Sequence, residues 1–233
     1  MKEIAQDLYL IEGLRVSNVY LLASEDGLAL VDTGMAGDVD WIVVQIAEAG
    51  YEPSALQSIL VTHAHEHHIG GLPQLARRYD AQVIPHQAEA PYLEGSERLP
   101  AGSWMQRGMA WLRETFLGVA PQIEVARSLE DGEVLDFLGG LRVIHTPGHT
   151  PGSMCLYQEE RRILFCGDLL FNGHPFTVRQ GLQYPPSFFS VDSAEVKRSA
   201  RRLLDLEIDL LCPGHGDPIA SGAEAKIAAL VEG

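Results

Sequence analysis

The sequence predicts a layered α/β fold in which two β-sheets pack face to face and helices cover their outer faces. Three observations lead to this fold class. Short apolar or alternating runs of strand length recur in both halves of the 233-residue chain. Helix-like patterns alternate with these runs and close each half. No linker or short-period repeat separates the halves, so we expect a single domain over residues 1–233.

The first half begins with three strand-like runs separated by turn residues, which predict a β-meander. These runs are LYLIEG at 8–13, NVYLLAS at 18–24 and GLALVDTG at 27–34. A helical pattern over Asp38–Gly50 follows, and Gly50 ends it. Strand and helix then alternate as the buried strand SILVTH at 58–63, a helix over Gly70–Tyr79, the strand Gln82–Pro85 and a short helix over His86–Leu93.

The second half repeats the strand-rich pattern. Its predicted elements are strands at 133–139, 141–148, 153–158 and 162–168, a helix over Ser193–Leu206, a strand at 208–214 and a C-terminal helix from about Ser221. Between the halves, glycines and prolines bracket the tryptophan- and methionine-rich segment 103–118. We expect a helical insertion at about 95–128, near the active site, which serves either as core packing or as an apolar wall over the substrate.

Composition excludes several classes of function. The formal net charge of −15 disfavours nucleic-acid binding, which depends on clustered cations. The N-terminus has no basic region followed by an apolar run, and no segment approaches the ~20 apolar residues of a membrane helix. The three cysteines are widely spaced, which fits reduced thiols. We therefore expect a cytoplasmic protein that acts on a small molecule, with neither nucleic acid nor membrane as partner.

A histidine cluster directly after the strand at 58–63 carries the strongest chemical signal. Four of the nine histidines fall within residues 63–68, in the sequence HAHEHH. In an extended segment, His63 and His65 point the same way and can reach one ion, while His68 can face a second ion from the next turn. The alternative is a solvated, tag-like tract that binds metal only loosely.

Three more strand ends deliver residues that bind metals. His149 lies in TPGHTPGS, Asp168 ends the apolar strand of FCGD, and His215 lies in CPGHGD. A lone loop histidine is usually not a ligand, and a lone aspartate often only caps a turn. Four strand ends that together supply histidines and one aspartate predict a metal site.

These motifs, in this order and with VDTG before them, resemble the metallo-β-lactamase superfamily over about residues 8–219. The resemblance implies a four-layer αβ/βα sandwich, with two mixed sheets flanked by helices and metals at one edge of the sheets. It implies a first metal site of His63, His65 and His149, a bridging Asp168, and a second site with His68 and His215. It also implies that Asp32 of VDTG supports the metal-binding loop from behind the ligands.

One position departs from the family pattern. The family usually has an aspartate in HxHxDH where this chain has His67, and that aspartate binds the second metal. If His67 binds there, the site exchanges an anionic oxygen for a neutral nitrogen. A nitrogen-rich site favours zinc, with iron or manganese as alternatives, over magnesium or calcium. We expect two zinc ions, with a single tightly held ion as the alternative.

The expected reaction is hydrolysis of a thioester, lactone or ester by a metal-held hydroxide. The leaving group needs a proton, which His67 could carry if it is not fully coordinated, and His174, expected in a surface loop, is the other candidate. A rival interpretation is an iron oxidoreductase resembling persulfide dioxygenases, with His63, His149 and Asp168 on one iron. A third is a degenerate member with little catalysis. A dimer is compatible with all of these.

Overall fold

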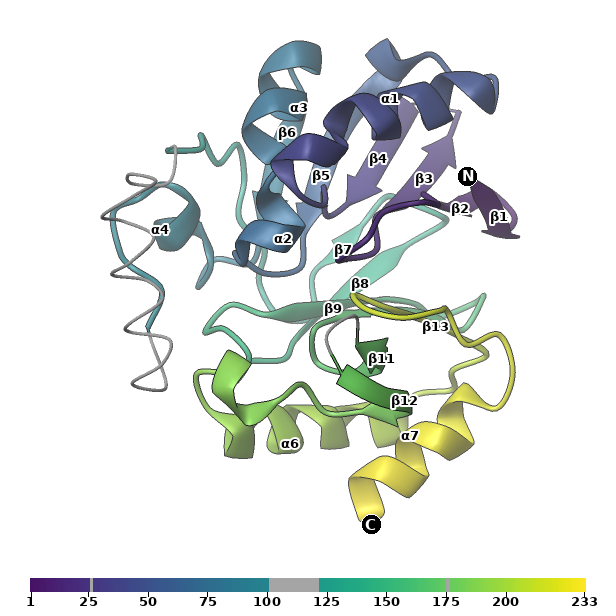
Figure 1. Ribbon diagram of the computed structural model, residues 1–233, viewed down its shortest axis with the longest axis vertical. Coiled ribbons are helices and arrows are strands. Elements are labelled where there is room, and N and C mark those ends of the chain that lie inside the picture. The colour runs from purple at the N-terminus through teal and green to yellow at the C-terminus, as the bar shows by residue number, and fades with distance from the viewer. Residues whose placement is uncertain (26, 101–121, 175–176) are drawn as a thin grey trace.

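The structure, a computed structural model, describes residues 1–25, 27–100, 122–174 and 177–233 of the chain. In these residues the elements form four layers in the order helix, sheet, sheet, helix (Figure 1). The outer layers contain α1 (Val39–Glu48) and α3 (Leu72–Tyr79) on one side and α6 (Ser193–Arg201) and α7 (Ala223–Glu232) on the other. The predicted fold class, an αβ/βα sandwich, is therefore confirmed.

The first sheet has six strands that follow the chain order. They are β1 (Lys2–Ala5), β2 (Leu8–Leu10), β3 (Tyr20–Ser24), β4 (Gly27–Val31), β5 (Leu56–Val61) and β6 (Gln82–Pro85). The pairs from β1 to β4 are antiparallel, as predicted for a meander, whereas β4, β5 and β6 are parallel. The connection from β4 to β5 carries η1 (Ala36–Asp38), α1 and η2 (Pro53–Ala55). The connection from β5 to β6 carries α2 (Glu66–Ile69) and α3. The chain therefore leaves β4 and β5 at the same edge of the sheet.

The second sheet has five strands in the order β13, β10, β9, β8, β7. Their bounds are Leu210–Pro213, Ile163–Gly167, Met154–Gln158, Leu141–His145 and Val134–Leu135. Only β10 and β13 pair in parallel; the other pairs are antiparallel. Every residue of β9 and β10 is buried, because these central strands are covered on both faces. Asp192 caps α6 by accepting from the Ala194 and Glu195 amides, and η4 (Arg202–Asp205) extends the helix.

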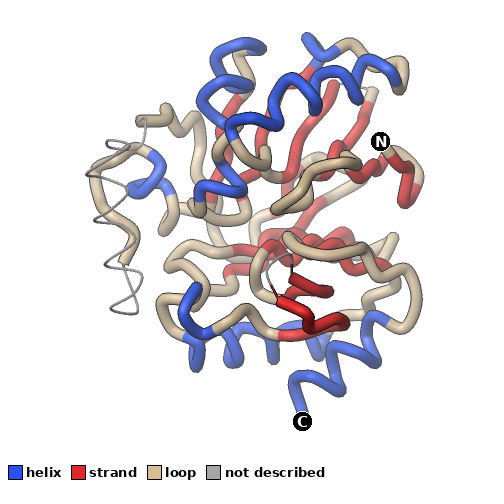
Figure 2. Tube along the Cα trace, in the orientation of Figure 1, coloured by secondary structure: helices blue, strands red, loops and turns tan. Residues whose placement is uncertain are grey.

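Three apolar clusters separate the four layers. One lies between the first sheet and its helices, the second between the two sheets, and the third between the second sheet and α6 and α7. Neighbouring residues of a strand enter different clusters: Ile59 faces the helices and Leu60 faces the other sheet. The stacked sheets and the outer helices are visible in Figure 2. None of the helices in the described part of the chain combines the length and apolar character that crossing a bilayer requires.

The structure differs from the predicted elements at two places. It adds β1, and it adds a hairpin of β11 (Phe171–His174) and β12 (Thr177–Gln183). His174 was expected in a surface loop, and this prediction is wrong, because its backbone belongs to β11. Gly173 and the proline after His174 interrupt the strand pattern, which explains the misassignment.

Two predicted helical segments also need comment. The short helix expected over His86–Leu93 is a single turn, α4 (Ala90–Leu93), which follows a bridge of His86 to Leu129 and a turn at 87–89. The expected helical insertion at 95–128 falls largely on residues 101–121, outside the described residues, and the whole segment 103–118 lies there. Its described flanks, 95–100 and 122–128, contain neither helix nor strand.

Candidate metal centre

The predicted ligands meet at one edge of the sandwich, where strands of both stacked sheets end. His63 and His65 follow β5 of the first sheet, and the chain then turns into α2, which carries His67 and His68. The second sheet contributes one residue after each of three strands: His149 after β8, Asp168 after β10 and His215 after β13. Segments up to 152 residues apart in sequence therefore converge because their strands end at one place.

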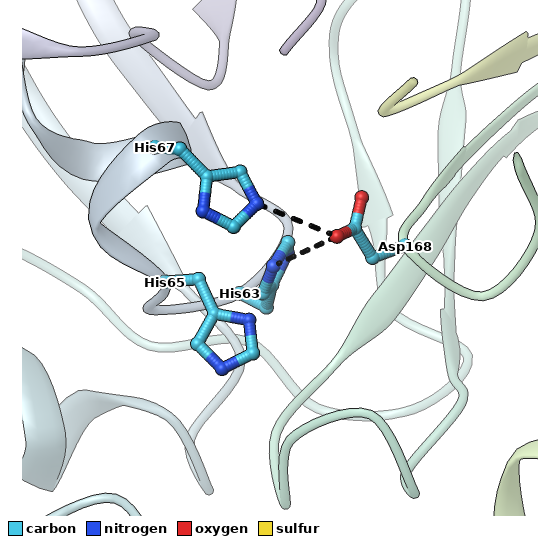
Figure 3. Close-up of side chains that lie close together, drawn as sticks. All are labelled: His63, His65, His67 and Asp168. Carbon is cyan, nitrogen blue, oxygen red and sulfur yellow. Dashed lines mark ion pairs between the residues drawn. The ribbon is translucent and has the colours of Figure 1, made fainter. Parts of the chain in front are cut away.

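Besides a group of Asp32, His63 and His68, the described side chains form two groups of potential ligands that contain Asp168. One group is His63, His65, His67 and Asp168, and the other is His67, His68, Asp168 and His215. In each group the donor atoms all lie within 4.8 Å of one another. Figure 3 shows the His63 and His67 rings turned toward the Asp168 carboxylate, with His65 beside them. The two groups share His67 and Asp168, which is the arrangement needed for two neighbouring cation positions.

His149 completes the first group although it comes from the other sheet. Its Nε2 lies 2.9 Å from His65 Nδ1 and 3.2 Å from Asp168 Oδ2. Its Nδ1 lies 3.2 Å from the Ser190 hydroxyl, just beyond η3 (Ser187–Phe189), which fixes the ring orientation. The sequence analysis did not identify Ser190, because no local motif marks it.

Asp168 is the centre of the cluster. Its Oδ2 lies 3.2 Å from His215 Nε2, 3.6 Å from His63 Nε2 and 3.7 Å from His67 Nε2. Its Oδ1 lies 3.2 Å from His68 Nε2. Gly214 permits this packing, because a β-carbon at that position would clash with Asp168 Oδ1.

Two buried atoms of the cluster test whether a cation fits. His63 Nε2 and Asp168 Oδ1 are shielded from solvent and make no hydrogen bond of acceptable geometry, although Asp168 Oδ1 lies 3.2 Å from His68 Nε2. Leaving such atoms unpaired costs free energy, which a cation bound between them would offset. The donor set of imidazole nitrogens with one carboxylate suits zinc or iron better than manganese, magnesium or calcium, which prefer oxygen ligands. The residues therefore fit a transition-metal centre.

Asp32 lies behind the ligands and fixes His68. It accepts hydrogen bonds from the Thr62 amide at 2.8 Å and the Thr62 hydroxyl at 2.7 Å, and its Oδ2 lies 2.7 Å from His68 Nδ1. These contacts direct His68 Nε2 toward Asp168. They are the contacts expected of a residue that orients a ligand, and the supporting role itself stays a prediction.

The protonation states favour ligand chemistry. Burial holds the pKa of His63 and of His65 well below its usual value, and burial together with His68 lowers the pKa of His67 to about 4. These rings are therefore neutral at pH 7, as metal ligands must be. Burial opposes ionisation of Asp168, but neighbouring histidines, His215 first, hold its pKa well below the usual range.

His68 behaves differently. Burial lowers its pKa, but the carboxylates of Asp168 and Asp32 outweigh burial and raise the pKa to about 10. Without a metal, His68 is protonated and balances the two carboxylates. A cation that binds through His68 Nε2 displaces this proton, so binding at this position releases acid.

A small cavity of about 80 Å³ opens onto the cluster. Its polar lining is His65, His67, His149, Asp168 and His215, and its apolar lining is Val16, Phe171 and Phe189. Among these described lining residues, Asp168 is the single carboxylate. The cavity can hold a reacting group against the ligands on one side and apolar groups on the other.

Comparison with known proteins identifies the family. The family model described as the metallo-beta-lactamase superfamily matches residues 13–215. The chain belongs to the metallo-β-lactamase superfamily. It is 29% identical over 219 residues to the Bacillus subtilis protein named "Probable metallo-hydrolase YflN", an alignment that covers 88% of this chain and 83% of that protein.

Two further matches bear on the site. The human protein named "Acyl-coenzyme A thioesterase MBLAC2" is 29% identical over 179 residues, which cover 67% of this chain and 59% of that protein. The crystal structure of TTHA1623, described as a di-iron-bound form, matches with a TM-score of 0.65 and 31% identity over 91% of this chain and 94% of that one. The resemblance read from the motifs is thus confirmed.

His67 occupies the place where the superfamily pattern predicts aspartate. Its Nε2 belongs to both ligand groups, and its side chain is 28% exposed at the cavity. The Ser17 hydroxyl donates to its backbone carbonyl and holds the turn in place. The ring therefore reaches the same positions as the other ligands.

The other three histidines of the chain are His86, His145 and His174. The structure does not describe the side chain of His174, proposed as a proton carrier. The rings of His86 and His145 stack, with centroids 3.9 Å apart. Neither is in a group of potential metal ligands found among the described residues.

Proposed function

We propose that this chain is a metal-dependent hydrolase whose substrate is an acyl thioester. The observation that carries the proposal is the cavity, which has imidazoles and one carboxylate on one side and Val16, Phe171 and Phe189 on the other. The apolar side suits an acyl group, and the polar side suits a reacting carbonyl. Similarity to proteins named metallo-hydrolase and acyl-coenzyme A thioesterase supports this reaction class.

The ligand set indicates where the cations would bind and which metal would suit the site. His63, His65, His149 and Asp168 would hold one ion, and His67, His68, Asp168 and His215 the other. A divalent transition metal held there supplies a water activated for attack and polarises the substrate carbonyl. Zinc is the metal we propose. The alternatives are iron, which also suits imidazole ligands, and manganese, which prefers oxygen ligands.

The protein's own residues support the choice of a thioester as the proposed substrate. Asp168 is surrounded by five imidazoles within 3.7 Å, so it is committed to them and is not free to carry a proton to a leaving group. His67 replaces the second carboxylate. A thiol has a pKa near 8.5, so a thiolate departs with little protonation, whereas an alkoxide or amine leaving group needs an acid. The site therefore favours the leaving group that least needs a proton.

The test is a substrate panel on protein purified without a histidine tag, with its metal content measured. The panel compares a short acyl thioester with the matching oxygen ester, a lactone and a β-lactam, and a separate arm measures oxygen uptake with glutathione persulfide. We expect kcat/KM for the thioester to exceed that for the oxygen ester by at least about tenfold.

The Asp168→Asn variant is the control for the site, because it removes the carboxylate shared by both ligand groups. We expect it to lose the metal and the thioesterase activity together. Oxygen uptake with no hydrolysis of any panel member would overturn the proposal and favour the iron oxidoreductase. Hydrolysis that survives in Asp168→Asn would place the activity elsewhere.

A further inference from the structure

Glu89 is a buried carboxylate that the proposed reaction does not use. It precedes α4 and is 0% exposed, although no basic side chain accompanies it in its hydrogen bonds among the described residues. Burying an ionisable group at this depth is costly and requires compensation by hydrogen bonds. Its hydrogen-bond partners therefore indicate its role.

All three partners belong to the two loops that carry the histidines. Glu89 Oε1 accepts from the Ala64 amide at 2.6 Å, and Ala64 lies between His63 and His65. Oε2 accepts from the Gly152 amide at 2.7 Å and from the Thr150 hydroxyl at 3.0 Å. One carboxylate thus links the loop after β5 in the first sheet to the loop after β8 in the second.

The contact between Glu89 and the second loop depends on a close backbone approach. A β-carbon at Gly152 would clash with the Glu89 backbone nitrogen and lie 2.6 Å from the Glu89 β-carbon. Thr150 also bonds to Ser153, with the two hydroxyl oxygens 2.7 Å apart, which fixes the direction of its hydroxyl. The loop geometry is therefore arranged around the carboxylate.

We propose that Glu89 is a positioning residue of the metal centre, which holds the loops of His65 and His149 at the separation that lets both rings reach one cation. The two rings come from different sheets, yet His65 Nδ1 lies 2.9 Å from His149 Nε2. The inference rests on the metal centre of the proposed function, and it concerns metal affinity instead of the reaction.

The hydrogen bonds require a carboxylate at this position. An ionised carboxylate accepts at both oxygens, whereas a glutamine side chain has one acceptor and one NH2 donor. Because Oε1 faces the Ala64 amide and Oε2 faces the Gly152 amide, either orientation of a glutamine places its NH2 against a backbone N–H. Glu89→Gln therefore breaks the link to one loop with almost no change in volume.

The protonation state sets the pH of the experiment. Burial raises the pKa of Glu89 to about 7, against the opposing effect of its three hydrogen bonds. Measurements near pH 8 keep the wild-type carboxylate ionised. Glu94→Gln is the matched control, because Glu94 lies at the other end of α4 and is exposed.

The experiment measures cobalt(II) binding by competition with a chelator, together with the visible spectrum of the cobalt protein and the thermal unfolding of the metal-free protein. We expect Glu89→Gln to bind cobalt about 10- to 100-fold more weakly than the wild type and to show an altered visible band. Thr150→Val removes one of the three hydrogen-bond donors to Glu89, and we expect this variant to bind cobalt about 2- to 10-fold more weakly than the wild type. Glu94→Gln should match the wild type in cobalt affinity and in the visible spectrum.

Cobalt affinity and spectrum that stay within about twofold of the wild type in Glu89→Gln would overturn the proposal. So would lower stability of the metal-free protein with an unchanged cobalt spectrum, because that result indicates a purely structural role. If Glu89→Gln does not fold, Thr150→Val decides, and wild-type affinity in that variant refutes the idea. None of these readouts uses a substrate, so failure of the thioesterase proposal is a separate result.

Discussion

Replacing His67 with aspartate restores the usual superfamily residue and tests what this position does. The neutral His67 ring lies 3.7 Å from Asp168 Oδ2, so His67→Asp places a second negative charge beside a buried carboxylate. Two unit charges about 5 Å apart at an effective dielectric constant of about 20 repel by about 3 kcal/mol. His67→Asn has the size of aspartate without the charge, which makes it the matched control.

We expect opposite effects without and with metal. Without metal, His67→Asp should melt below His67→Asn by about 6 to 12 °C, since 1 kcal/mol corresponds to about 2 to 4 °C in a domain of this size. With zinc, the order should reverse, because the added carboxylate attracts a dication. The second equivalent should then bind at least about tenfold more tightly to His67→Asp than to His67→Asn.

The assay combines differential scanning calorimetry of the metal-free proteins near pH 8 with zinc titration against a chromophoric chelator. The reasoning is refuted if His67→Asp and His67→Asn melt together without metal and bind the same number of zinc ions with the same affinity. Residue 67 would then lie outside the metal positions, and the ligand group that contains His68 and His215 would lack a fourth member.

Three further predictions follow. Asp32→Asn should bind metal about 10- to 100-fold more weakly, as measured by chelator competition, because it disturbs the contact that orients His68; unchanged affinity contradicts this. Burial and His145 lower the pKa of His86 to about 4 in the folded protein. As the pH drops, His86 is therefore protonated in the unfolded chain before it is protonated in the folded one, and the free energy of unfolding falls from about pH 6.5 toward 4. Between about pH 7.5 and 5, the free energy of unfolding measured in urea should therefore fall by about 2 kcal/mol less in His86→Asn than in the wild type. Parallel plots of this free energy against pH would contradict the prediction. Chelation of the metal should lower the unfolding midpoint by about 8 °C or more while far-ultraviolet circular dichroism stays native; loss of secondary structure would contradict it.

The sequence predicts the strand ends that carry the ligands but not the contacts that hold them. The pattern over Gln82–Pro85 predicts β6 with the bounds that the structure shows, because a short apolar run bounded by polar residues is a local signal. Glu89 has no such signal. Its partners lie 25 to 63 residues away in sequence, and only the packing of two sheets brings them to one carboxylate.

The hairpin of β11 and β12 shows the same limit in secondary structure. Its sequence contains Gly173 and a proline directly after His174, which favour a loop when read locally. In the fold, Asn172 donates its backbone N–H to the His215 carbonyl at 2.9 Å, so pairing with a distant segment overrides the local preference. The prediction for His174 failed for this reason.

The metal centre joins two sheets, yet protein contacts already join them at the same place. The Met154 amide donates to the Thr62 carbonyl at 3.1 Å, and the Asn18 amide donates to the Gly214 carbonyl at 2.8 Å. The Tyr20 hydroxyl donates to the Pro213 carbonyl at 2.7 Å. Because these bonds and the Glu89 link need no cation, metal binding does not have to assemble the site. Differences in affinity among variants of residue 67 should therefore report ligand chemistry, whereas variants of Glu89 should report the position of the loops.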